Sequence, residues 1–156
     1  MNRVLVVDDH VVIRRGIQNI VRAWPEWEIC GEAGSGEEAV RLTVELKPDI
    51  VVMDISMPGM GGLEATRTIS RCSPNTKVLL LTLHEAPHWV RTALQAGARG
   101  YVLKSDAEGE LMRALNLVSG KGIYVSPNID SEWVRKIITE LGLSGTKEAI
   151  KARDAT

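Results

Sequence analysis

The sequence predicts a doubly wound α/β fold in which one five-stranded parallel sheet carries helices on both faces. Four short runs of the chain are continuously apolar, which is typical of parallel strands that are buried on both sides. Amphipathic helical patterns separate the runs in strict alternation, as in sheets built from right-handed crossovers. Phenylalanine is absent and aromatic residues make up 4% of the chain, so aliphatic side chains must build the core.

Five strands are expected from the apolar runs and from one weaker segment. The continuous runs, which give strands one, three, four and five, are Val4–Val7, Ile50–Met53, Val78–Leu81 and Tyr101–Leu103. The segment Trp27–Ala33 carries two glutamates and a glycine, which indicates a half-exposed strand at an edge of the sheet. In the flavodoxin-like strand order 2-1-3-4-5, strands one and three are neighbours at the switch point.

Helices are expected between the strands and after the last one. Apolar stripes at helical spacing define the first and third of them: Ile13, Ile17, Ile20, Val21 and Trp24, and Leu63, Thr66 and Ile69. Ser35 and Ser105 each precede a glutamate by three residues, which predicts a capping box at two helix starts. Val44 is expected on the inner face of the second helix, and Pro87 is expected as the first residue of the fourth.

Composition excludes several classes of protein. The chain has 156 residues, with 19 basic and 20 acidic side chains and a net charge of -1, which argues against a polybasic membrane anchor or a nucleic-acid coat. No apolar run approaches the roughly 18–20 residues of a membrane span, and the first residues show no signal-peptide pattern. Two cysteines are too few for a disulfide framework. We therefore expect a cytoplasmic protein with no membrane partner.

Polar residues stand directly after the apolar runs. Asp8 and Asp9 follow the first run, Asp54 follows the third, Thr82 the fourth and Lys104 the fifth. In an open parallel sheet, ligands bind beyond the carboxyl ends of the strands, near the switch point. Three carboxylates are therefore expected to converge, with a hydroxyl and an ammonium group beside them.

Such a cluster predicts a metal site and a chemistry. Three carboxylates at short range require a cation, and oxygen ligands with open positions for water and phosphate favour Mg²⁺. A carboxylate beside Mg²⁺ can act as a nucleophile toward phosphorus and form an aspartyl phosphate. Lys104 would then pair with one phosphoryl oxygen, and Thr82 would donate a hydrogen bond to another.

Each of these residues also has an ordinary structural explanation. Asp8 and Asp9 are common at helix starts and Asp54 is common in turns, while Thr82 suits a strand and Lys104 a solvated edge. The agreement of all five positions, each at a strand end and in the right order, favours the functional interpretation.

Four motifs resemble the receiver domain of bacterial two-component response regulators. They are Val-Val-Asp-Asp-His at 6–10, Met-Asp-Ile-Ser-Met-Pro-Gly-Met-Gly-Gly at 53–62, Leu-Thr at 81–82 and Gly-Tyr-Val-Leu-Lys at 100–104. The resemblance covers residues 1–122. The Asp-Asp-His opening, the Met-Pro-Gly-Met-Gly-Gly loop and the Gly-Ala-Arg-Gly-Tyr segment at 97–101 are similar to the LuxR-type subgroup in particular.

The resemblance implies a role for each site residue. Asp54 would accept a phosphoryl group from a sensor histidine kinase. Mg²⁺ would be held by Asp9, by Asp54 and by the backbone carbonyl of Ser56, with Asp8 assisting through water. Thr82 and Tyr101 would form the switch pair, in which Thr82 moves toward the phosphoryl group and Tyr101 rotates into the space that it leaves.

The resemblance also implies which residues control the lifetime of the phosphorylated state and what phosphorylation produces. Ser56 and His84 stand two residues after Asp54 and Thr82, where receivers control the access of hydrolytic water, so substitution of His84 should change the autodephosphorylation rate. The chain would not be an enzyme beyond its own phosphorylation and dephosphorylation. Phosphorylation is expected to produce a homodimer.

The last part of the chain departs from the LuxR-type pattern. We assign 123–130 to a linker and 131–156 to a helical tail, a remnant of a helix-turn-helix domain. An apolar stripe predicts a helix that ends at Gly142, and a second short helix is expected from Leu143 to Ile150; the stripe is Val134, Ile137, Ile138 and Leu141. The tail could pack back on the receiver, mediate dimerisation or result from truncation. We expect Trp133 and Ile137 to be buried in some contact.

The function expected first is a response regulator that switches conformation on phosphorylation at Asp54 and controls an output, expected to be transcription. Two alternatives are a LuxR-type transcription factor that binds DNA through its tail in a dimer, and a stand-alone receiver that acts through protein contacts. The tail is short and balanced in charge, so DNA binding is not expected from this chain alone. A phosphohydrolase with an Asp nucleophile is disfavoured, because Ser56 stands where its second acid is expected.

Overall fold

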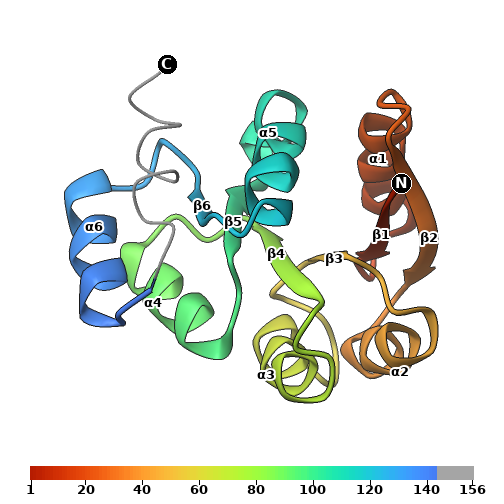
Figure 1. Ribbon diagram of the computed structural model, residues 1–156, viewed down its shortest axis with the longest axis horizontal. Coiled ribbons are helices and arrows are strands. Elements are labelled where there is room, and N and C mark those ends of the chain that lie inside the picture. Colours follow the sequence, from red (N-terminus) through yellow and green to blue (C-terminus); the bar gives the residue numbers. More distant parts are fainter. Residues whose placement is uncertain (144–156) are drawn as a thin grey trace.

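The computed structural model describes residues 1–143 as one parallel sheet with helices on both faces (Figure 1). The strands are β1 Asn2–Val7, β2 Trp27–Ala33, β3 Ile50–Met53, β4 Lys77–Thr82, β5 Gly100–Leu103 and β6 Tyr124–Val125. Their order is β2-β1-β3-β4-β5-β6, and every pairing is parallel. The predicted fold class and the order of the first five strands are confirmed.

The expected count of five strands is wrong, because β6 lies within the segment that we assigned to the linker. Tyr124 is fully buried. Ser126, the residue directly after β6, holds this strand to β5. The Ser126 N–H donates to the Tyr101 carbonyl (2.8 Å), and the Leu103 N–H donates to Ser126 Oγ (2.9 Å). Two paired residues are too short a run to stand out as a strand in the sequence.

The helices are α1 Val11–Arg22, α2 Gly36–Leu46, α3 Gly62–Cys72, α4 Pro87–Ala96, α5 Ala107–Ser119 and α6 Ser131–Glu140. Ser35 caps α2 as expected, since its hydroxyl accepts from the Glu38 N–H, and Pro87 is the first residue of α4. Ser105 does not cap α5, because a 3-10 turn over Lys104–Asp106 delays the start of that helix. Val44 is 53% exposed, so it does not lie on an inner face.

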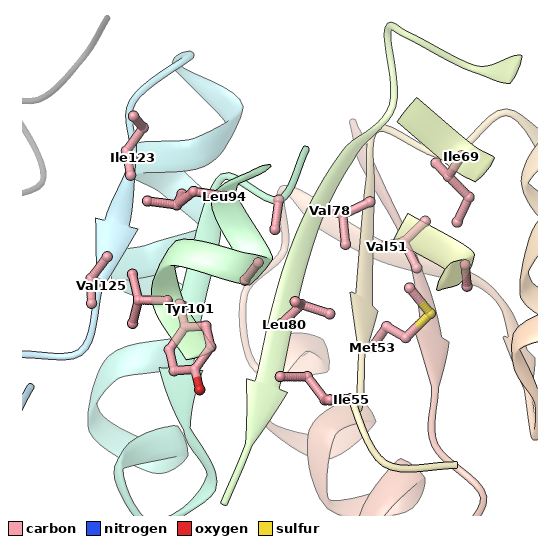
Figure 2. Packing of buried hydrophobic residues seen from close by; sticks show 14 of the residues in the cluster. Val51, Met53, Ile55, Ile69, Val78, Leu80, Leu94, Tyr101, Ile123 and Val125 are labelled. Carbon is pink, nitrogen blue, oxygen red and sulfur yellow. The ribbon is translucent and has the colours of Figure 1, made fainter. Parts of the chain in front are cut away.

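Two apolar layers enclose the sheet. Helices α1 and α5 cover one face, while α2, α3 and α4 cover the other (Figure 1). Successive strand residues point to opposite faces, so each central strand contributes to both layers, and β3 is buried throughout. Figure 2 shows the layer beneath α3 and α4, where Val51, Met53, Val78 and Leu80 pack together.

The helix α6 packs against α4 and extends this layer. Its buried side chains are Val134, Ile137 and Ile138. Arg91 of α4 joins the contact, because its guanidinium lies 2.9 Å from a Glu140 carboxylate oxygen and 5.7 Å from the centre of the Trp133 ring. The expected tail helix and the burial of Ile137 are confirmed, and the contact is made within the chain.

The end of α6 also follows the sequence pattern. Gly142 has a φ of 65°, a left-handed conformation that suits glycine at a helix end. The second tail helix, which we expected from Leu143 to Ile150, falls outside the described residues, which end at Leu143. None of the helices in the described part of the chain is long and apolar enough to cross a membrane.

Truncation of Ile138 tests whether α6 is part of the folded unit. This side chain is fully buried against α4, so we expect Ile138→Ala to lower the free energy of unfolding by about 2–5 kcal/mol. Urea unfolding followed by circular dichroism measures the change. Lys136→Ala, an exposed change on the same helix, should leave the midpoint unaltered. Equal midpoints for both variants would show that α6 does not contribute its packing in solution.

Candidate functional site

The site lies at the carboxyl edge of the sheet, where three central strands end in polar residues. The backbone continues the strand hydrogen bonds into the site: the Asp8 N–H donates to the Ala33 carbonyl and the Asp54 N–H donates to the Val7 carbonyl, both at 3.1 Å. These bonds fix both aspartates at the switch point, where the sequence predicts them. The site is therefore set by the sheet.

A lysine joins the two aspartates. The Lys104 Nζ lies 3.1 Å from Asp8 Oδ2 and 3.4 Å from Asp54 Oδ2. The side chains of Asp8 and Asp54 are 1% and 7% exposed, so the two carboxylates have little access to water. One ammonium shared by two buried carboxylates leaves a net negative charge at this point.

Asp9 and His10 complete an acidic cluster next to Asp8. One ligand atom from each of Asp8, Asp9 and His10 lies within 4.8 Å of the others. The His10 Nδ1 is 3.1 Å from Asp8 Oδ1 and 3.2 Å from Asp9 Oδ1. Apart from this 3.2 Å contact with His10, the buried Asp9 Oδ1 has no hydrogen-bond partner among residues 1–143. A buried carboxylate oxygen with so little compensation suits a cation, so the cluster fits a metal ion.

His10 was not among the expected site residues. The sequence indicated only a residue at a helix start, and His10 does occupy the N-cap of α1, with no side-chain capping bond. Its position directly after two aspartates is the signal that could have placed it in the acidic cluster.

Burial raises the pKa of the Asp54 carboxyl group. The nearby Lys104 ammonium acts in the opposite direction, while the Asp8 carboxylate raises this pKa further. The Ser56 N–H, 3.3 Å from Asp54 Oδ1, favours the ionised form. A carboxylate with a raised pKa is more basic than a solvated one, a property that suits a nucleophile.

The raised pKa of Asp54 predicts a pH-dependent difference between the protein and Asp54→Asn. The folded protein disfavours the ionised carboxylate, so the wild type loses stability as the pH rises from the ordinary value of 3.8 through the raised one. The variant has no such titration. In EDTA, we expect Asp54→Asn to be the more stable protein at pH 7, with a smaller advantage near pH 4. Urea midpoints at the two pH values measure this, and an advantage that grows toward pH 4 would contradict it.

Thr82 and Tyr101 lie on neighbouring strands and share a backbone partner. The Thr82 hydroxyl accepts from the His84 N–H (3.1 Å), and the Tyr101 hydroxyl donates to the His84 carbonyl (2.7 Å). Burial raises the pKa of the Tyr101 phenol, and a hydrogen bond with Thr82 acts against that shift. The Tyr101 ring lies within the apolar layer (Figure 2). The two residues expected to form the switch pair are therefore linked in the structure.

Ser56 and His84 are also brought together. Ser56 Oγ lies 3.1 Å from His84 Nε2, although the residues are 28 positions apart. The His84 imidazole stacks on the Trp89 indole, with ring centres 4.0 Å apart and an interplanar angle of 13°. The sequence analysis missed Trp89, whose place in the first turn of the helix after Thr82 was the available signal.

The glycine-rich loop after β3 allows the close packing behind Asp54. A Cβ atom at Gly62 would lie 2.1 Å from the Asp54 carbonyl oxygen, so a side chain there would displace the backbone of Asp54. The Gly62 N–H donates to the Ile55 carbonyl (2.8 Å) and closes the loop. The loop therefore helps to fix the position of the carboxylate.

Together these features define a doubly wound α/β protein with carboxylates, a lysine and a hydroxyl at the carboxyl edge of its sheet. The sequence pattern of the family described as response regulator receiver domain matches residues 4–116. The chain therefore belongs to the response regulator receiver domain family.

Individual relatives agree with this assignment. Response regulator GacA from Pseudomonas viridiflava is 43% identical over 136 residues, which are 87% of this chain and 64% of GacA. Transcriptional regulatory protein LiaR from Bacillus subtilis is 39% identical over 145 residues, which are 93% of this chain and 67% of LiaR. A LuxR-family two-component response regulator from Aurantimonas sp. has a TM-score of 0.81 at 37% identity, covering 87% of this chain and 97% of that structure. The resemblance to the LuxR-type subgroup is thus confirmed.

Proposed function

We propose that Asp54 accepts a phosphoryl group from a sensor histidine kinase in a Mg²⁺-dependent reaction. The observation that carries this proposal is the position of its buried carboxylate, 3.4 Å from the Lys104 ammonium and next to the cluster of Asp8 and Asp9. A carboxylate oxygen of Asp54 attacks phosphorus, the phosphorus–nitrogen bond of the kinase phosphohistidine breaks, and the imidazole leaves with its electron pair.

The residues around Asp54 have distinct tasks in this reaction. Asp9, Asp54 and the Ser56 carbonyl would hold Mg²⁺, and Asp8 would orient its water ligands. When bound, the cation would offset the charge on the incoming phosphoryl group. Lys104 then exchanges its contact with Asp54 for one with a phosphoryl oxygen, and it keeps Asp8 as its partner.

The switch follows from the same contacts. When the Thr82 side chain rotates so that its hydroxyl donates to a phosphoryl oxygen, the hydroxyl oxygen moves away from the His84 N–H and no longer accepts from it. Movement of the loop from Leu83 to Ala86 changes the position of the His84 carbonyl and therefore of Tyr101. The charge of the phosphoryl group thereby shifts the position of the first turn of α4, the helix against which α6 packs.

The output that we propose is control of transcription by a cytoplasmic protein that forms a homodimer on phosphorylation. The name of LiaR, a transcriptional regulatory protein, supports this output. The chain spans 64% of the length of GacA. Because α6 packs on α4, we propose that residues 1–156 alone do not bind DNA. A gel shift that weakens with salt would instead favour DNA binding through the tail.

Phosphotransfer from a radiolabelled histidine kinase tests the proposal. We expect label on the protein in Mg²⁺, at most one phosphoryl group per chain, and no label in EDTA. The chain is not proposed to turn over other substrates. Sustained phosphatase turnover of a small phosphate ester would indicate a hydrolase, and label that does not depend on the cation would contradict the proposed site.

A further inference from the structure

The His84 imidazole is held between the candidate phosphorylation site and the first turn of α4. Its Nε2 meets Ser56 Oγ at 3.1 Å, and its ring face lies against the Trp89 indole at a centre distance of 4.0 Å. Ser56 is itself tied to the site, because its N–H donates to Asp54 Oδ1. The His84 side chain therefore connects Ser56, two residues after Asp54, with Trp89 in α4.

Trp89 is the firmer of the two partners of this imidazole. Its side chain is half-buried and packs against the apolar layer. The backbone N–H of Trp89 donates to the Ala86 carbonyl at 3.1 Å. Ser56, by contrast, is exposed and offers a single hydroxyl. The rings of His84 and Trp89 are nearly parallel, which maximises their contact.

The dependence on Trp89 grows in the phosphorylated state. In the structure, the His84 backbone is anchored through its N–H to the Thr82 hydroxyl and through its carbonyl to the Tyr101 hydroxyl. Under the proposed switch, Thr82 turns toward the phosphoryl group and gives up its bond to His84. The stack on Trp89 then becomes the main contact that fixes where the imidazole lies.

We propose that Trp89 is a positioning residue that holds the His84 imidazole across the approach to Asp54 and so prolongs the life of the aspartyl phosphate. This inference rests on the proposed function of Asp54. In the loss reaction, a water oxygen attacks phosphorus, the bond from phosphorus to the Asp54 oxygen breaks, and orthophosphate leaves with the protons of the water. With Nε2 engaged by Ser56, the imidazole excludes water from that approach and does not act as a base.

The test compares the decay of label in four proteins. Trp89→Leu keeps apolar volume and removes the ring face, so we expect the half-life of the aspartyl phosphate to fall about fivefold, the effect of losing one modest contact. Trp89→Phe retains a ring face and should restore most of the wild-type half-life. His88→Ala removes the other imidazole near the indole, whose ring centre is 5.6 Å away and tilted, and should leave the half-life unchanged.

A double variant tests whether Trp89 acts through His84. We expect His84→Ala to shorten the half-life as Trp89→Leu does, and the combined variant to decay no faster than either one. Additive effects would mean that Trp89 acts by another route. Unfolding midpoints of all variants separate this from a general loss of stability, because the Phe and Leu variants should unfold alike and yet differ in half-life.

Nuclear magnetic resonance of the unphosphorylated protein provides a readout that needs no label. The Hε1 signal of His84, assigned by its absence in His84→Ala, should lie under the ring current of the indole and shift in Trp89→Leu. An unchanged signal, or equal half-lives in the wild type and Trp89→Leu, would overturn the proposed role of Trp89 and leave the proposed function of Asp54 intact. A wild type that cannot be labelled would overturn the proposed function, and this inference with it.

Discussion

Asp54→Asn is expected to abolish phosphotransfer to the protein. The amide lacks the anionic oxygen that attacks phosphorus, and among residues 1–143 the other carboxylate that pairs with Lys104 is that of Asp8. The Asp8 side chain is 1% exposed, so it is a poor replacement. Labelling by a histidine kinase in Mg²⁺ measures the effect, and we expect a loss of at least about a hundredfold, comparable to removal of other catalytic groups.

Asp49→Asn is the matched control for this experiment. Asp49 stands directly before β3 and Asp54 directly after it, so the two residues lie at opposite ends of the same strand. The Asp49 carboxylate accepts from the Arg3 N–H at 2.8 Å. An asparagine can still accept that bond, so this variant should be labelled as the wild type is. Equal labelling of Asp54→Asn and the wild type would remove the basis of the proposed function.

Asp9→Asn is expected to uncouple the stability of the protein from Mg²⁺. In EDTA, the variant should be more stable than the wild type, because one of the two carboxylates of the acidic cluster is gone. In Mg²⁺ the order should reverse. A ligand at a hundred times its dissociation constant stabilises the folded state by about 2.7 kcal/mol, and the variant should lose most of that gain. Thermal unfolding in EDTA and in Mg²⁺ measures both effects.

Glu108→Gln serves as the control for the cation. Glu108 is an exposed carboxylate in the first turn of α5, near the same edge of the sheet but outside the cluster. Its removal should leave the response to Mg²⁺ intact. If Asp9→Asn kept the full stabilisation by Mg²⁺, the cation would not bind through Asp9.

The sequence was sufficient to place the residues of the site, because each follows an apolar run that can be recognised by itself. Asp8, Asp54 and Lys104 needed only the strand order to be brought within hydrogen-bond distance. The resemblance to receiver domains singled out Ser56 and His84, whose side chains meet in the structure. The positions of Asp8, Asp54 and Lys104 depend instead on local pattern and on sheet topology, which are the strongest signals in a single sequence.

The remaining features depend on contacts that no local pattern encodes. β6 has two paired residues and owes its place to the bonds of Ser126 with β5. The packing of α6 on α4 also brings Glu140 to Arg91, 49 positions away. Trp89 looked like an ordinary residue of a helix start until His84 was found against its ring. In each case a tertiary contact, and not a sequence period, determines the position.

The most direct measurement of the central claim is the location of the phosphoryl group. After labelling in Mg²⁺, borohydride reduces an aspartyl phosphate to homoserine, and peptide mapping by mass spectrometry identifies the reduced residue. We expect one modified position, Asp54, in labelled protein and none in protein treated with EDTA. Modification at Asp8 or Asp9, or a label on a histidine side chain with Asp54 intact, would contradict it.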